Sequence, residues 1–431
     1  MSDAERAMSG RTGTLLVIAS MIGTGVFTTS GHLLTDLGSP LAVLLCWLLG
    51  GVLALCGALA YGELAVRYPE SGGETTLTTH LYGPRVGFVA GFVSVVVGFA
   101  APIAASALAF GEYADRALGG GSSPLVGGLV LLAAVAVLHA RGRGAVLFQD
   151  SFTLVKVLVI GGMAGIGLVS GHPPHLGHRA DEVGSTLLSG EFAVGLVIVS
   201  FAYAGWNAAV YVAGELRDPA RTLPRALALG AGAVTLLYVV LNAALLMAAP
   251  ASALAGETEV AHVAAATLFG DGAARLVSAL IALGLLSTVG AMVMTGARVA
   301  EALGRRHPGL GFLQRGTAAR APAAATLLIG GLAAAMALSA GFEALLVYTG
   351  VTLSLFAALT AAGVFVVRRR DPGHPSRAAN PLHPASTLLF LALSAWMIVA
   401  SLVARPLAAL AAGGTLLLGL LLAIPFTRAD R

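Results

Sequence analysis

Apolar segments long enough to cross a membrane recur along the whole chain. About 20 apolar residues in a helix span the hydrocarbon core of a bilayer, and segments of this kind separated by polar loops predict an all-α integral membrane protein. The twelve predicted transmembrane helices lie near 13–33, 40–66, 86–111, 124–139, 150–170, 190–213, 225–248, 275–300, 322–340, 344–367, 384–404 and 407–426.

The composition also indicates that these apolar segments are surrounded by lipid. Of the 431 residues 57% are hydrophobic and only 11% are charged, whereas charged residues make up about 25% of a typical soluble domain. The 56 glycines suit closely packed or interrupted transmembrane helices. The net charge of +4 does not predict a nucleic-acid partner, because the basic residues gather in loops on one side.

Arginine placement gives the orientation. With residues 1–12 as a cytoplasmic tail, 20 arginines lie on the cytoplasmic side of the twelve segments and only Arg116, Arg179, Arg275 and Arg405 lie outside. We therefore expect a multi-pass protein of the cell (inner) membrane with both termini in the cytoplasm. The one lysine, Lys156, falls inside the fifth segment.

Two predicted helices carry glycine in mid-span. The first contains Gly23-Thr24-Gly25 and the sixth contains Gly205, and each glycine disfavours helix by about 1 kcal/mol relative to alanine. Unwound backbone at membrane depth is tolerated where it lines a cavity, and paired interruptions in two halves of a chain indicate a transporter site. The alternative is that these glycines only allow close helix packing.

Several motifs occur in order on the expected helices. They are IGTGVF at 22–27, YPESGGE at 68–74, YGP at 82–84, GF at 87–88, and the run from Phe201 through Gly205-Trp206-Asn207 to ELRDPARTLP at 215–224. This set resembles the amino acid–polyamine–organocation superfamily, and the last run is most similar to its L-type amino acid transporter branch and the bacterial homologues of that branch.

The resemblance implies the leucine-transporter fold. Two inverted five-helix repeats are expected at 13–170 and 188–367, followed by helices eleven and twelve at 384–426. It also implies a secondary transporter of neutral L-amino acids that works by alternating access, as an exchanger or a proton-linked carrier.

The broken helices are the expected amino acid site. N–H groups at Thr24 and Gly25 suit the substrate carboxylate, helped by the half-helix dipole, and by resemblance carbonyls near both breaks accept from its ammonium group. Phe201 is the gate that the resemblance favours. The expected substrate-binding residues are Met21, Ile22, Gly23, Thr24, Gly25, Phe201, Ala202, Tyr203, Ala204, Gly205, Trp206 and Asn207.

Lys156 is the expected coupling residue. A lysine near the centre of a membrane helix costs about 2.5–3.5 kcal/mol on insertion, so we expect a specific role. The resemblance implies that its ammonium replaces sodium, with Ala19, Ile22 and Ser287 as acceptors and Thr288 as a neighbouring candidate. Tyr238 and Asn242, one turn apart on the seventh segment, are expected either to support the first break or to form a simple interhelical hydrogen bond.

No catalytic residue, cofactor or metal site is expected. Cys46 and Cys56 lie ten residues apart on one predicted helix, about 15 Å, so they cannot form a disulfide. The predicted outer loop between the third and fourth helices, 112–123, has no cysteine, and we expect no disulfide-linked partner subunit.

Two other functions stay open. Cationic amino acids, amines or polyamines on the same fold would favour acidic residues facing the cavity, and neither break contains an acidic residue. A sensor or channel would show repeated polar pore residues. Among the remaining charges, we expect a local or interhelical ion pair for Glu63, and lipid-headgroup contacts for the arginines at 368–370.

Overall fold

Helices form almost all of this computed structural model, which describes residues 8–140, 158–165, 167, 169, 180–314 and 322–428. In these residues the only strand-like pairing is an isolated bridge between Met8 and Leu216. The helices are α1 Gly10–Met21, α2 Gly25–Thr28, α3 Ser30–Leu37, α4 Pro40–Arg67, α5 Gly73–Tyr82, α6 Pro84–Val93, η1 Ser94–Ala100, α7 Ala101–Leu118, α8 Pro124–Ala140, α10 Ala180–Leu187, α11 Gly190–Ala202, η2 Ala208–Glu215, α12 Pro219–Ala248, α13 Ala251–Leu254, α14 Val260–Phe269, α15 Asp271–Arg306, η3 Pro308–Gln314, α16 Ala323–Ser339, α17 Phe342–Arg370, η4 Pro375–Ala379, α18 Ala385–Ala404 and α19 Pro406–Arg428.

The predicted all-α membrane architecture is confirmed. Eight helices in the described ranges have the length and apolar composition to cross a membrane, and four shorter apolar helices accompany them. Eleven of the twelve predicted segments coincide with described helices, and the fifth falls largely outside the described residues. One loop prediction is wrong in part, because the stretch 112–123 is helical as far as Leu118.

Local sequence explains several helix ends. Ser39 caps α4 by accepting a hydrogen bond from the Ala42 N–H, and Pro40 takes the first helical position, where its missing N–H costs nothing. Gly38 ends α3 with a φ of 62°, which favours glycine. Ser189 caps α11 in the same way as Ser39 caps α4.

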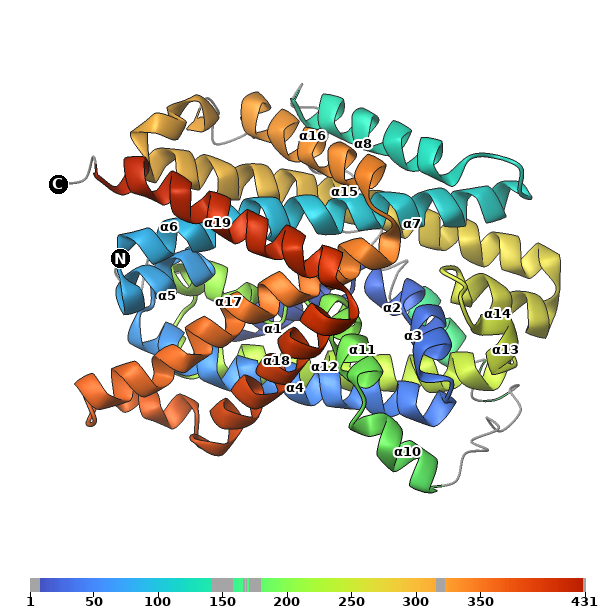
Figure 1. Ribbon diagram of the computed structural model, residues 1–431, viewed down its shortest axis with the longest axis horizontal. Helices are drawn as coiled ribbons and strands as arrows, with labels where there is room; N and C mark the ends of the chain where they lie inside the picture. Colours follow the sequence, from blue (N-terminus) through green and yellow to red (C-terminus); the bar gives the residue numbers. More distant parts are fainter. Residues whose placement is uncertain are drawn as a thin grey trace.

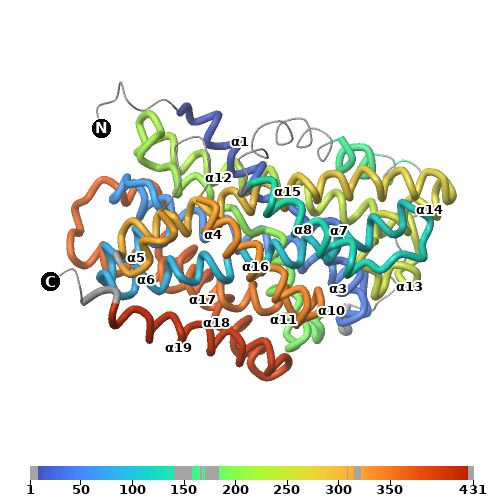
Figure 2. The backbone as a smooth tube through the Cα atoms, turned by 90° about the horizontal axis from the view of Figure 1, so that it is seen from above, coloured from blue at the N-terminus to red at the C-terminus, as the bar shows by residue number. Residues whose placement is uncertain are grey.

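Two groups of long helices enclose the centre. In Figure 1, α7 and α15 run side by side above α4 and α12. Helix α1 packs against α12, which packs against α4. Helix α19 lies along the outer edge in Figure 2, against α6 and α17.

The third span contains a π-helical turn, η1, between α6 and α7. Pro102 stands just after this turn, and it has no N–H to donate to the carbonyl four residues earlier, on Gly98. Single π turns inside α-helices frequently mark functional sites. Gly98 and Phe99 of this turn line the central cavity described below.

A buried ion pair ties α4 to the end of α17. Arg368 donates from Nε and Nη2 to the two carboxylate oxygens of Glu63, each at 2.8 Å, and Glu63 is fully buried. Arg368 also donates to the Asn380 carbonyl. The interhelical ion pair expected for Glu63 is confirmed, whereas the expectation of a lipid-headgroup contact is wrong for Arg368.

Replacing Arg368 with methionine should leave the Glu63 carboxylate buried without its cation. Breaking a buried pair in this way costs about 3–5 kcal/mol, so we expect a clear loss of thermal stability in detergent. Arg369→Met, the exposed neighbour on the same helix, is the matched control. Equal melting temperatures of the two variants would show that the pair is not stabilising.

Candidate functional site

Two helices are broken at the predicted positions. Helix α1 ends at Met21 and α2 begins at Gly25. Helix α11 ends at Ala202, and after a turn the chain continues as the 3₁₀ helix η2 from Ala208. Gly205 lies in this second turn with a φ of 101°, which L side chains rarely adopt.

The two breaks touch each other through glycine. A Cβ on Gly25 would lie 2.5 Å from the Cα of Ala202, at the end of α11. A Cβ on Gly205 would lie 2.7 Å from the carbonyl oxygen of Ser20, at the end of α1. Both distances are too short for a real Cβ, so the two unwound backbones pack directly against one another.

Backbone polar groups remain open at this junction. Among the described residues, the N–H groups of Thr24 and Gly25 have no protein partner. In the second break the Ala202 and Ala204 carbonyls are equally free, while the Phe201 carbonyl already accepts from the Ala204 N–H. Buried groups of this kind normally find a partner, so the junction suits a ligand with both an anionic and a cationic group.

A cavity of about 780 Å³ lies against both breaks. Helices α4, α5, α6, α7, α15, α17 and α18, together with η1 and η2, complete its wall. Every residue expected to bind substrate lines it, namely Met21, Ile22, Gly23, Thr24, Gly25, Phe201, Ala202, Tyr203, Ala204, Gly205, Trp206 and Asn207. Ala19, Ser287 and Thr288 line it as well.

The cavity extends toward one end of the molecule. There its wall includes Arg298 and Arg306 of α15 and the loop residues Ser71 and Gly72. The sequence does not mark these arginines as site residues, because they reach the cavity only through the packing of α15.

The other end is tightly closed. The Tyr113 hydroxyl donates to the Phe27 carbonyl at 2.7 Å. Arg116 donates to Glu257 and Glu259, each at 3.1 Å. A Cβ on Gly31 would meet the Glu257 carbonyl oxygen at 2.0 Å, so the backbone of α3 packs directly on that loop.

Side chains from α12 and α7 hold the first break. Tyr238 of α12 donates its hydroxyl to the Met21 carbonyl. Ser30 donates to the Asn242 side-chain oxygen, one turn further along α12. The Thr24 hydroxyl shares a hydrogen bond with Ser106 of α7, a contact that nothing in the sequence predicts.

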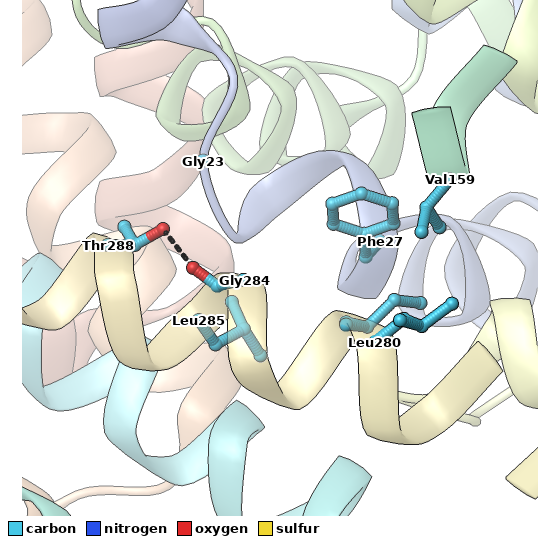
Figure 3. Close-up of a pocket in the computed structure, with 8 residues that line it drawn as sticks. Gly23, Phe27, Val159, Leu280, Gly284, Leu285 and Thr288 are labelled. Atoms are coloured by element: carbon cyan, nitrogen blue, oxygen red, sulfur yellow. Dashed lines mark hydrogen bonds between the residues drawn. The ribbon is translucent and has the colours of Figure 1, made fainter. Parts of the chain in front are cut away.

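A narrow pocket adjoins the first break on the side of α15. Gly23, Phe27, Val159 and Thr288 line it, as Figure 3 shows. The Thr288 hydroxyl donates to the Gly284 carbonyl at 3.0 Å. Lys156 itself lies outside the described residues, so its contacts with Ala19, Ile22 and Ser287 stay a prediction.

The aromatic residues of the second break have packing partners. The Tyr203 hydroxyl donates to the Trp47 carbonyl at 2.9 Å, and its ring lies against Trp47 and Tyr238. Trp206 packs edge-on against Tyr61, with ring centroids 4.7 Å apart. These rings fix the backbone of the break.

Glu74 places a buried carboxyl in the cavity wall. It stands in the first turn of α5, and its Oε1 accepts from the Tyr61 hydroxyl at 2.7 Å and from the Asn207 side-chain amide at 3.1 Å. Glu74 belongs to the YPESGGE motif at 68–74 but is not among the site residues predicted from the sequence, because the loop reaches the cavity only in the folded chain.

Burial raises the pKa of the Glu74 carboxyl, although the hydrogen bonds from Tyr61 and Asn207 work in the opposite direction. A place in the first turn of a helix favours the anion by about 0.3–1 kcal/mol, but burying an ion costs several kcal/mol. The neutral carboxyl therefore persists to a higher pH than in an exposed glutamate.

The sequence of this chain is similar to those of known transporters. A family model described as amino acid permease matches residues 9–421. Serine/threonine exchanger SteT of Bacillus subtilis is 29% identical over 397 residues, which cover 90% of this chain and 89% of that protein. Large neutral amino acids transporter small subunit 2 of Homo sapiens is 30% identical over 407 residues, covering 91% and 75%. The b(0,+)-type amino acid transporter 1 of Mus musculus is 27% identical, covering 91% and 82%.

The fold also matches a solved structure, that of MhsT in complex with L-phenylalanine. The TM-score is 0.59 at 14% sequence identity, and the match covers 92% of this chain and 98% of that one. At this identity the likeness shows the fold alone, which is the leucine-transporter fold expected from the sequence.

Gly25→Ala and Gly205→Ala should each force the two breaks apart. The added methyl groups meet backbone atoms, which cannot move aside as a flexible side chain can. We expect at least tenfold weaker ligand binding by the purified variants. The control is Gly331→Ala on α16, where the added Cβ would have no atom within 4 Å. Wild-type affinity in Gly25→Ala would show that the contact between Gly25 and Ala202 is not needed for binding.

Proposed function

Because this chain belongs to the amino acid permease family, and is therefore a multi-pass membrane transporter of amino acids, we propose that it carries neutral L-amino acids independently of sodium. It works by alternating access, as an exchanger or a proton-linked carrier. The first inverted repeat is placed at 13–170, the second at 188–367 and the two additional helices at 384–426.

The observation that carries the proposal is the pair of open backbone segments at one cavity. The free N–H groups at Thr24 and Gly25 suit a carboxylate, and the free carbonyls of Ala202 and Ala204 suit an ammonium group. An α-amino acid carries both groups on one carbon. It therefore satisfies the two breaks together without any charged side chain.

The wall around the breaks favours a neutral substrate side chain. Gly50, Leu53, Ala54 and Leu353 supply apolar surface. A cationic amino acid or polyamine is the second candidate, and the carboxyl of Glu74 favours it. The positive charges of Arg298 and Arg306 on the same cavity oppose it.

Sodium independence rests on Lys156. Its expected ammonium position beside Ala19, Ile22 and Ser287 leaves no electrostatic need for a sodium ion. Ala19 and Ser287 line the cavity beside the first break, which supports a coupling site there.

The distribution of arginine between the two sides of the membrane supports the proposed orientation. We place both termini in the cytoplasm and the protein in the cell (inner) membrane, because 20 of the 24 arginines then face inward. In that orientation the cavity opens to the cytoplasm. The human relative is named a small subunit, but the stretch 112–123 of this chain has no cysteine, so we propose no disulfide-linked partner.

Proteoliposomes loaded with unlabelled amino acids test the function. We expect uptake of a labelled neutral L-amino acid that is unchanged when choline replaces sodium, and competition by small and medium neutral amino acids. Strict sodium dependence would contradict the role of Lys156. Competition by diamines or cationic amino acids alone would make the second candidate the substrate.

Lys156→Ala should lose transport by at least tenfold, because the first break then lacks its expected cation. Transport should be measured as counterflow, which needs no ion gradient. Arg369→Ala, a basic residue away from the cavity, is the control. Full transport by Lys156→Ala would remove the proposed role.

A further inference from the structure

We propose that the Glu74 carboxyl is the proton-binding group that links proton movement to amino acid transport. This inference rests on the proposed function. The proposed function leaves exchange and proton-linked transport as alternatives, and this inference selects proton-linked transport and names the residue that carries the proton.

The backbone conformation of the loop before α5 places the Glu74 carboxyl in the cavity wall. Gly72 and Gly73 precede it with φ values of 132° and 60°, and both values favour glycine. A Cβ on Gly73 would lie 2.4 Å from the Tyr211 ring. The chain therefore turns closely around Tyr211, and Glu74 ends up 7% exposed in the cavity wall.

The carboxyl has no basic partner in the part of the chain that the structure describes. Among the described residues, no lysine, arginine or histidine forms an ion pair with Glu74. Arg306, on the neighbouring α15, donates to Thr76 instead, at 3.3 Å. The polar groups that face Glu74 are the Tyr61 hydroxyl from α4 and the Asn207 amide from the second break. The Tyr211 ring of η2 lies against the preceding residue, Gly73.

The other described elements around the loop supply no further charge at Glu74. Helices α6 and α17 pack against α5, and in the described residues neither forms an ion pair with this carboxyl. Arg298 lines the same cavity but donates to Glu301 at 2.9 Å. A carboxylate buried without a cation binds a proton more readily than one paired with arginine.

The hydrogen bonds link this proton to the substrate segment. Asn207 belongs to the second break, and its amide donates to Oε1 of Glu74. When the carboxyl is ionised, Oε1 is a strong acceptor for Asn207 and Tyr61. When it is protonated, these bonds weaken and the carboxyl itself becomes a donor. The proton therefore changes how tightly α5 holds the second break.

The cavity supplies a route for the proton. Glu74 and the two breaks line one continuous space, so in an open state water reaches the carboxyl and exchanges protons with it. In a closed state the same carboxyl is desolvated further, which favours the neutral form. One proton taken up on one side of the membrane is released on the other, together with the substrate.

The test measures proton movement and amino acid transport separately in proteoliposomes. A pH-sensitive dye inside the vesicles reports proton entry after addition of L-serine or L-leucine, and counterflow of the labelled amino acid reports transport. For wild type we expect substrate-driven acidification. Net uptake should fall by up to about tenfold per pH unit above the pKa of the site, since occupancy of one proton site falls by that factor.

Glu74→Gln keeps the size and hydrogen-bonding capacity of the side chain but cannot exchange a proton. We expect it to retain counterflow, to lose substrate-driven acidification and to show a flat pH profile. Glu70→Gln is the matched control, because Glu70 lies in the same loop and is exposed, with His80 at 3.2 Å. It should behave as wild type.

Tyr61→Phe provides an independent test, through the midpoint of the pH profile, if Glu74→Gln does not fold. Tyr61 donates to the carboxyl, and a hydrogen bond to the charged form favours that form. Its loss should raise the pKa of the carboxyl, so the midpoint of the pH profile should move to higher pH. A purely structural role of Tyr61 would lower the rate without moving the midpoint.

Three outcomes would overturn the proposal. They are counterflow by wild type without any substrate-driven acidification, an unchanged pH profile in Glu74→Gln, and selective loss of cationic amino acid transport in that variant with the pH profile kept. The last outcome would assign Glu74 to substrate charge. If wild type shows no amino acid counterflow at all, the proposed function itself fails.

Discussion

The direct contact between two unwound backbones is the constraint on which the rest of this structure depends. Gly25 packs against Ala202, and Gly205 packs against the Ser20 carbonyl, so neither position has room for a side chain. Because the breaks meet, their open N–H and C=O groups face one small region. Tyr238 and Ser106 then fix that region from α12 and α7.

The same contact explains why the cavity needs few charges. Free backbone groups at Thr24, Gly25, Ala202 and Ala204 already provide both polarities, and an amino acid brings the matching pair. The ionisable groups of the cavity wall, such as Glu74 and Arg306, belong to α5 and α15 and not to either break. They are therefore available for coupling and selectivity, while the backbone groups of the breaks hold the carboxylate and ammonium groups that every amino acid shares.

The sequence alone could predict structural features that depend on residues close together along the chain. Glycine lowers helix stability locally, so the two breaks could be placed at Gly23–Gly25 and at Gly205, and the residues around them line one cavity. Contacts between distant residues could not be predicted in this way. Glu63 and Arg368 are 305 positions apart, and Thr24 meets Ser106 only after α1 and α7 pack together.

The most direct test of the central claim is an experimental structure of the protein with a bound neutral L-amino acid. The account predicts the carboxylate within hydrogen-bond distance of the N–H groups of Thr24 and Gly25, and the ammonium group beside the carbonyls of Ala202 and Ala204. An amino acid bound elsewhere in the cavity, with its carboxylate on Arg298 or Arg306, would contradict it.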